Sequence, residues 1–206
     1  MSTTEFTHRY LPAPDGQKTQ RTLLLLHGTG GDENDLIDLG RAIDPDAAIL
    51  SPRGRVLENG APRFFRRLAE GVFDEADVIA RAHELAGFIK SAVTEYEIDP
   101  VHLVAVGYSN GANIAAAMML LGVADLPRAI LLRAMVPLAK VDLKPALKTT
   151  VLMAEGQFDP IANPDNGRQL AEMLRATGAT VDLIFQPAGH ELTGNDVMAA
   201  RRWLAS

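Results

Sequence analysis

The chain has 206 residues, of which 47% are hydrophobic and 22% charged, a balance typical of folded globular proteins. The net charge of −6 disfavours a general nucleic-acid binder, and no apolar run approaches the roughly 20 residues of a membrane span. Cysteine is absent, which excludes disulfides and thiolate catalysis. We expect one domain over residues 1–206 and, because the N-terminus lacks a secretory-signal pattern, a cytoplasmic location.

Short apolar runs alternate with helical patterns along most of the chain. In chain order the pattern predicts an edge strand at 5–12, a strand at 22–28, a helix at 34–43, a strand at 47–52, a helix at 73–96, a strand at 101–106, a helix at 110–121, strands at 129–136 and 150–156, a helix at 167–177, a strand at 181–189 and a helix at 196–204. Continuous apolar strands that alternate with helices indicate an α/β fold with a mostly parallel sheet covered by helices on both faces.

Residues 52–73 do not fit this alternation. A connection of this length is unusual in a compact domain and tends to be functional. The segment is rich in arginine: Arg53, Arg55, Arg63, Arg66 and Arg67. We expect these side chains to pair with nearby acids such as Glu58, Glu70 and Asp74. Binding of an anionic substrate group is the alternative.

The sequence GYSNG at residues 107–111 lies where a predicted strand passes directly into a predicted helix. It matches G-x-S-x-G, in which the serine sits on a strained strand-to-helix turn and the glycines avoid a collision within the bend. The free N–H groups at the start of the helix point to the same spot. Ser109 is therefore the candidate nucleophile, with a helix N-cap serine as the alternative.

A serine hydroxyl needs an adjacent base, and His190 is the histidine best placed to provide it. It lies on a loop after the last predicted strand, at the strand ends where sites of this fold class form. His27 also follows a strand, but it precedes Ser109, whereas the α/β-hydrolase order is serine, acid, histidine. We expect His27 to hold its adjacent loop.

The base in turn needs a carboxylate that fixes its tautomer. Asp159 follows the penultimate predicted strand and lies between Ser109 and His190 in the chain. Glu155 in the same loop and Asp165 further on are the alternative acids. An ordinary turn aspartate before proline is the non-catalytic interpretation of Asp159.

The loop HGTGGDENDL at residues 27–36 follows the first strong strand. Acyl transfer builds negative charge on a carbonyl oxygen, and two backbone N–H groups can stabilise it. Thr29 and Asn110 are the candidate oxyanion donors. The glycines match neither G-x-x-x-x-G-K-[ST] nor G-x-G-x-x-G, which disfavours nucleotide binding. We expect no metal and no cofactor.

The segments LLLLHGTGGDENDL, SPRG, GYSNGANIA, EGQFDPI and GHEL lie within residues 23–192. Together they resemble the phospholipase/carboxylesterase family of α/β-hydrolases, which includes acyl-protein thioesterases. The chain looks most similar to small bacterial carboxylesterases, in which HGTGGDE and RFF recur. The resemblance implies an α/β-hydrolase fold without a large lid domain. It also implies Ser109 as nucleophile, Asp159 as acid, His190 as base, and Thr29 and Asn110 as oxyanion donors, and it allows a homodimer.

We therefore expect a serine hydrolase that cleaves small carboxylic esters with short to medium acyl groups. The candidate substrate-pocket residues are Phe64, Phe65, Met135 and Ile161, with ordinary core packing as the alternative. Two other functions stay open: a lysophospholipase or acyl-thioesterase that uses the same residues, and a non-catalytic hydrolase fold that binds a ligand.

Overall fold

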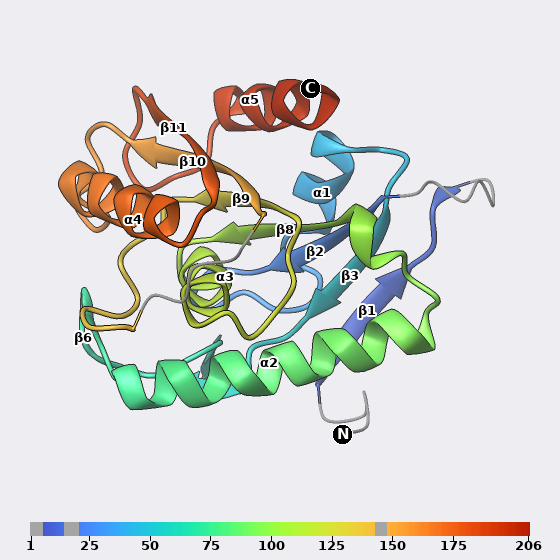
Figure 1. The fold of residues 1–206 in the computed structure, drawn as a ribbon, viewed down its shortest axis with the longest axis horizontal. Helices are drawn as coiled ribbons and strands as arrows, with labels where there is room; N and C mark the ends of the chain where they lie inside the picture. Colours follow the sequence, from blue (N-terminus) through green and yellow to red (C-terminus); the bar gives the residue numbers. More distant parts are fainter. Residues whose placement is uncertain (1–5, 15–20, 143–147) are drawn as a thin grey trace.

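The computed structural model describes residues 6–14, 21–142 and 148–206, and its centre is a seven-stranded sheet (Figure 1). The strand order is β1 (His8–Leu11), β3 (Ala48–Pro52), β2 (Thr22–Leu26), β8 (Leu103–Tyr108), β9 (Arg128–Leu132), β10 (Thr150–Gly156) and β11 (Thr180–Gln186). Every neighbouring pair is parallel except β1 and β3. The predicted mostly parallel sheet is thus confirmed, and the expected edge strand is β1.

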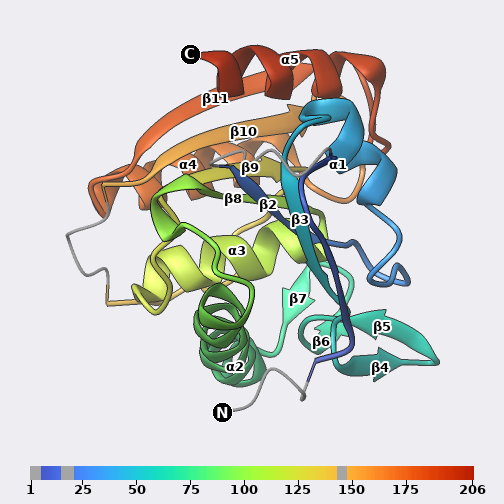
Figure 2. The same ribbon diagram turned by 90° about the vertical axis from the view of Figure 1, so that its right-hand side faces the viewer.

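Helices cover both faces of this sheet, as Figures 1 and 2 show. One face carries α1 (Ile37–Ile43) and α5 (Gly194–Ala205), and the other carries α2 (Glu75–Glu95), α3 (Asn110–Leu121) and α4 (Pro164–Ala176). Successive residues of a strand point to opposite faces, so each buried strand supplies both layers. In β2, Leu24 and Leu26 pack toward α2 and α3, whereas Leu23 and Leu25 pack toward α1 and α5. This explains why the strands are continuous apolar runs.

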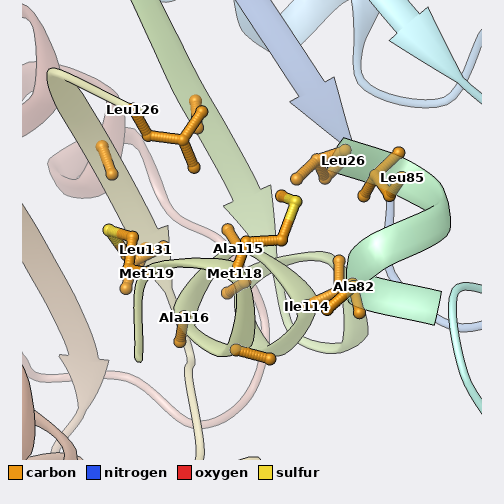
Figure 3. Close-up of a cluster of buried hydrophobic side chains, with 14 of the residues drawn as sticks. Leu26, Ala82, Leu85, Ile114, Ala115, Ala116, Met118, Met119, Leu126 and Leu131 are labelled. Atoms are coloured by element: carbon orange, nitrogen blue, oxygen red, sulfur yellow. The ribbon is translucent and has the colours of Figure 1, made fainter. Parts of the chain in front are cut away.

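Helix α3 is buried on nearly every side. Eleven of its twelve residues are buried, among them Ala115, Ala116 and Met118. Figure 3 shows α3 between Leu26 of β2, side chains of α2, and Leu131 of β9. Small side chains allow this close packing, and close packing holds the N-terminal end of α3 at a defined place against the sheet.

Several predicted boundaries are wrong by up to four residues, and local hydrogen bonds, turns and backbone angles explain the shifts. Helix α4 begins at Pro164 instead of residue 167 because Asn163 caps it and proline suits the first helical position. The strand predicted at 129–136 ends at Leu132 because Arg133 adopts a positive φ of 56°. Helix α1 begins at Ile37 instead of residue 34 because the preceding residues form turns. Glu5, where the edge strand was predicted to begin, lies outside the described residues.

The segment at 52–73 forms two short hairpins beside α2 (Figure 2). They are β4 (Val56–Glu58) with β5 (Ala61–Arg63), and β6 (Arg67–Ala69) with β7 (Val72–Phe73). Three arginines of the segment pair with the expected acids Glu58 and Asp74, in Arg63–Glu58, Arg66–Asp74 and Arg67–Glu58. Arg53 and Arg55 pair instead with Glu33 and Glu84, outside the segment. The arginine-rich character of the segment is therefore explained by local pairing.

Across the ranges described, no helix combines the length and apolarity that a membrane crossing requires.

Two glycines allow β8 to turn abruptly into α3. A Cβ atom on Gly107 would overlap the backbone of Gly111 and Ala112, inside the bend. A Cβ atom on Gly111 would overlap the carbonyl oxygen of Leu26 at the end of β2. Both overlaps are with backbone atoms, so no rotation of a side chain can relieve them.

We expect Gly111→Ala to lower the free energy of unfolding by about 1–3 kcal/mol or more, because the added methyl group must push α3 away from β2. Gly87→Ala is the matched control, since Gly87 lies within α2 and a Cβ there meets nothing within 4 Å. Loss of a helical glycine should raise stability by about 0.5–1 kcal/mol. Urea unfolding followed by circular dichroism measures both, and equal midpoints for the two variants would contradict the prediction.

Candidate active site

Ser109 occupies the sharp turn between β8 and α3. Its backbone has φ 51° and ψ −112°, a conformation that is strained for a residue with a side chain. The Ser109 N–H donates to the carbonyl oxygen of Leu132 at the end of β9, 2.9 Å away. The serine side chain makes no cap hydrogen bond to α3, although Ser109 stands at the N-cap position. This observation removes the alternative in which the hydroxyl serves only as a helix cap.

The Ser109 hydroxyl faces His190 instead. Its Oγ lies 2.9 Å from His190 Nε2, and His190 Nδ1 lies 2.8 Å from Asp159 Oδ2. A carboxylate only accepts hydrogen bonds, so Nδ1–H donates to Asp159 and neutral His190 presents a free Nε2 to the serine proton. The structure thus brings together the three residues that the sequence analysis singled out, although they are far apart in the chain.

Asp159 is held in place by hydrogen bonds. Its side chain has no exposed surface, and its second oxygen, Oδ1, accepts the N–H groups of Ile161 and Ala162 at 2.8 and 2.9 Å. These bonds orient the carboxyl group, so that Oδ2 holds the His190 ring in one tautomer and one orientation.

His27, the alternative histidine, has a structural environment. Its Nδ1–H donates to the carbonyl oxygen of Gly28 at 2.6 Å, and its Nε2 accepts the N–H of Gly54 at 2.9 Å. Burial lowers the pKa of His27, which is consistent with a neutral ring. Both ring nitrogens are engaged with the backbone, so His27 links its own loop to the residues after β3. This agrees with the role expected from the sequence.

The candidate oxyanion donors are Thr29, in the loop after β2, and Asn110, the first residue of α3. In the described part of the chain, the backbone N–H groups of Thr29 and Asn110 donate to no protein acceptor. Donors that are free and fixed in place are what an oxyanion requires. A Cβ atom on Gly28 would collide with the Tyr108 ring, so glycine lets the Thr29 loop lie close to the turn at Ser109.

The β4–β5 hairpin braces both of these donor residues, a contact that sequence reasoning missed. Arg63 Nη1 donates to Thr29 Oγ1 at 2.6 Å. The Phe64 N–H donates to Asn110 Oδ1 at 2.7 Å, and the Gly30 N–H donates to the carbonyl oxygen of Pro62 at 2.9 Å. The unusual length of the segment at 52–73 was the one available signal, and it did not indicate these partners.

The candidate pocket residues divide into two pairs. Phe64 and Phe65 are 3% and 0% exposed, and they pack against the rings of His27 and Phe73 respectively. They fit the alternative of ordinary core packing. Met135 is partly buried just after β9, and Ile161 is 39% exposed two residues beyond Asp159. Met135 and Ile161 stay predictions for the pocket lining.

The loop that carries Met135 is held by three side chains from different elements. The successive N–H groups of residues 134, 135 and 136 donate to Glu155 Oε1, Asn113 Oδ1 and Asn166 Oδ1 at 3.1, 2.7 and 2.6 Å. These acceptors come from β10, α3 and α4, so the loop is fixed to the elements around it.

In the described ranges, no group of three or more His, Cys, Asp or Glu side chains is arranged to hold a metal ion.

Glu155, the alternative acid, points toward this loop through Oε1. Its other oxygen, Oε2, is buried without a hydrogen-bond partner among the described residues. Burial raises the pKa of Glu155 to about 8. A carboxyl group that is neutral near pH 7 cannot stabilise an imidazolium as Asp159 can. Asp165, the other alternative, is exposed at the start of α4 and pairs with Arg168.

The raised pKa of Glu155 predicts a specific pH dependence of stability. The folded protein holds the Glu155 proton up to about pH 8, whereas an unfolded chain releases it near the ordinary value of 4.5. Between these values unfolding releases a proton, so the free energy of unfolding falls as the pH rises. Glu155→Gln keeps the shape and the acceptor oxygen but has no proton to lose. The variant should be more stable than the wild type, by roughly 1–3 kcal/mol at pH 7.

The measurement is urea unfolding of both proteins between pH 5 and pH 8. The margin in favour of Glu155→Gln should grow across this range. Glu172→Gln, on the exposed surface of α4, is the matched control and should show no such trend. A stability difference that stays constant from pH 5 to pH 8 would show that Glu155 is ionised in the folded protein.

The comparisons with known proteins agree with this architecture. The model of the phospholipase/carboxylesterase family matches residues 13–206. The chain is 45% identical over 185 residues to "Putative hydrolase MhqD" of Bacillus subtilis (strain 168), with 90% of this chain and 92% of the relative covered. The crystal structure of a Bacillus cereus carboxylesterase is similar with TM-score 0.91 and 43% identity, over 98% of this chain and 94% of that one. A carboxylesterase from Mesorhizobium loti matches with TM-score 0.92 and 33% identity, over 98% and 95% of the two chains. The chain therefore belongs to the phospholipase/carboxylesterase family of α/β-hydrolases.

Proposed function

We propose that this protein is a serine hydrolase that cleaves carboxylic esters with short or medium acyl groups. The observation that carries the proposal is the hydrogen-bonded chain from Ser109 Oγ through the His190 ring to Asp159. A nucleophile, a base and an orienting acid in this order are the arrangement that serine hydrolases use. Membership of the phospholipase/carboxylesterase family and the likeness to bacterial carboxylesterases support the ester as substrate.

In the first half of the reaction, His190 Nε2 accepts the Ser109 proton while Oγ attacks the ester carbonyl carbon. The carbonyl oxygen becomes negatively charged, and the N–H groups of Thr29 and Asn110 bind it. His190 then gives its proton to the leaving alcohol, the carbon–oxygen bond of the ester breaks, and an acyl-Ser109 ester is left. Asp159 stabilises the imidazolium that forms between the two proton transfers.

In the second half, His190 removes a proton from a water molecule that attacks the acyl-Ser109 carbonyl. The same backbone donors bind the second oxyanion, and the proton returns from His190 to Ser109 Oγ as the carboxylic acid departs. Every step uses side chains and backbone groups of this chain.

The short hairpins of residues 52–73 favour a small substrate. Phe64 and Phe65, which connect the two hairpins, are used for core packing. Met135 and Ile161 are the remaining candidates for apolar contact with an acyl group. The cytoplasmic location, the single domain over residues 1–206 and the homodimer stay predictions.

A lysophospholipase or acyl-thioesterase would use the same three residues, and the family name includes phospholipases. The two possibilities differ in the substrate that gives the higher kcat/KM. Comparison of p-nitrophenyl acetate, butyrate and octanoate with a lysophospholipid and an acyl thioester decides between them.

We expect Ser109→Ala to reduce kcat on p-nitrophenyl butyrate by about 10⁴-fold or more, because the nucleophile is removed. The same variant should lose labelling by a fluorophosphonate probe, which reacts with activated serines. Ser206→Ala, at the exposed end of the chain, is the matched control and should keep both. Activity that survives in Ser109→Ala would overturn the mechanism, and a folded wild type that neither labels nor hydrolyses would favour a ligand-binding role.

A further inference from the structure

Arg133 is a large charged side chain with no exposed surface, directly after β9. It forms an ion pair with Asp196, whose side chain is equally buried at the start of α5. The two charges meet in a double hydrogen bond, from Nη1 to Oδ1 and from Nη2 to Oδ2, each 2.9 Å long. Removal of two charges from water is costly, and a buried ion pair is weak evidence for a stabilising role. The arginine therefore needs another explanation.

The rest of the guanidinium group binds backbone carbonyls. Arg133 Nε donates to the carbonyl oxygen of Gly189 at 3.0 Å, and Nη2 donates to that of Glu191 at 2.7 Å. Nη1 also donates to the carbonyl oxygen of Ala154 in β10, at 3.0 Å. With the two bonds to Asp196, these contacts use all five N–H groups of the side chain. The two loop carbonyls belong to the residues immediately before and after His190.

The carbonyl oxygen of His190 itself accepts a hydrogen bond from Tyr108, the last residue of β8. Tyr108 Oη donates to it at 3.0 Å, and the Tyr108 and His190 rings lie 5.5 Å apart. Three successive carbonyl groups, of residues 189, 190 and 191, thus each accept a hydrogen bond from a buried or partly buried side chain. Strand β11 ends at Gln186, and the backbone bond from the Phe158 N–H to the Ala188 carbonyl lies just before these three residues. In the described ranges, the carbonyls of residues 189–191 are bound by side chains only.

The backbone at Arg133 is evidence that this side chain is required there. Its φ of 56° is a conformation that glycine or asparagine adopts at lower cost, and a bulky residue there is an outlier. Such strain costs on the order of 1–3 kcal/mol and persists where the surroundings impose it. Of the four non-glycine residues with positive φ in the described ranges, Ser109 and Arg133 follow the adjacent strands β8 and β9.

We propose that Arg133 is a positioning residue for the catalytic base: its guanidinium group holds the carbonyls on both sides of His190 and so keeps the imidazole ring aligned with Ser109 and Asp159. This inference rests on the proposed function, in which His190 is the base. Lysine cannot replace arginine in this role, because three donors on one nitrogen cannot reach five acceptors placed around a planar fork.

The test is Arg133→Lys, measured by p-nitrophenyl butyrate hydrolysis and by proton NMR. If the His190 ring is no longer held in alignment, the chemical step is slowed more than substrate binding is weakened. The value of kcat should therefore fall at least about 10-fold, while KM changes less than about 3-fold. The low-field resonance of the His190 Nδ1–H, which donates to Asp159, should broaden or disappear. A general loss of stability, with the folded fraction accounted for, would not produce this combination.

Two controls separate positioning from stability. Arg128→Lys changes an arginine that, among the described residues, donates to the Trp203 and Leu204 carbonyls at the end of α5, and it should keep kcat and the resonance. Asp196→Asn damages the same ion pair but keeps the guanidinium bonds to the loop, so its kcat should fall much less than that of Arg133→Lys. An unchanged kcat and resonance in folded Arg133→Lys would overturn the proposal, and so would an equal loss in Asp196→Asn.

If Arg133→Lys does not fold, the double variant Arg133→Met with Asp196→Asn replaces it. This variant removes both buried charges, so no uncompensated charge is left, and it still deletes the bonds to the loop. The same fall in kcat is expected, and full activity would overturn the proposal. Failure of the proposed function gives a different result: the folded wild type would be inactive, while the low-field resonance would still report whether Arg133 orders His190.

Discussion

The arrangement of this site depends on the close approach of α3 to the end of β2. Gly111 touches the Leu26 carbonyl, and this contact sets where the helix begins and therefore how sharply the chain must turn at Ser109. The strain at Ser109 is balanced by the burial of almost the whole of α3 and by the hydrogen bond from Ser109 to Leu132. A rigid core thus places a hydroxyl group where local preference alone would not.

The other groups of the site follow from the parallel sheet. The carboxyl ends of β2, β8, β9, β10 and β11 lie at one edge, so the loops after them meet there. Each loop is then tied to its neighbours by side chains. The hairpin of residues 56–63 and the residue after it hold the loop of Thr29 and Asn110, while Arg133 and Tyr108 hold the loop of His190. Side chains outside the reacting groups supply the order that hydrogen-bonded catalysis needs.

The carboxyl groups after β10 show how environment assigns roles. Asp159 and Glu155 are four residues apart and both buried, yet they differ in their partners. Asp159 accepts two backbone N–H groups and the His190 ring, whereas Glu155 accepts one N–H and leaves one oxygen without a partner among the described residues. Burial with a single backbone donor raises the pKa of Glu155 to about 8. The number of donors, which no sequence pattern reveals, separates the acid that can orient a base from one that cannot.

The alternation of strands and helices could be predicted from the amino-acid sequence, and with it the order in which Ser109, Asp159 and His190 follow their strands. These features are local, because apolar periodicity and turn residues can be recognised in short stretches of sequence. Three features emerge only from the packed fold: Phe64 and Phe65 lie in the core, the 52–73 segment holds the loop of Thr29, and Arg133 reaches the carbonyls beside His190. These contacts join residues that are distant in the chain, and their geometry exists only after the strands have been ordered and the helices packed against them.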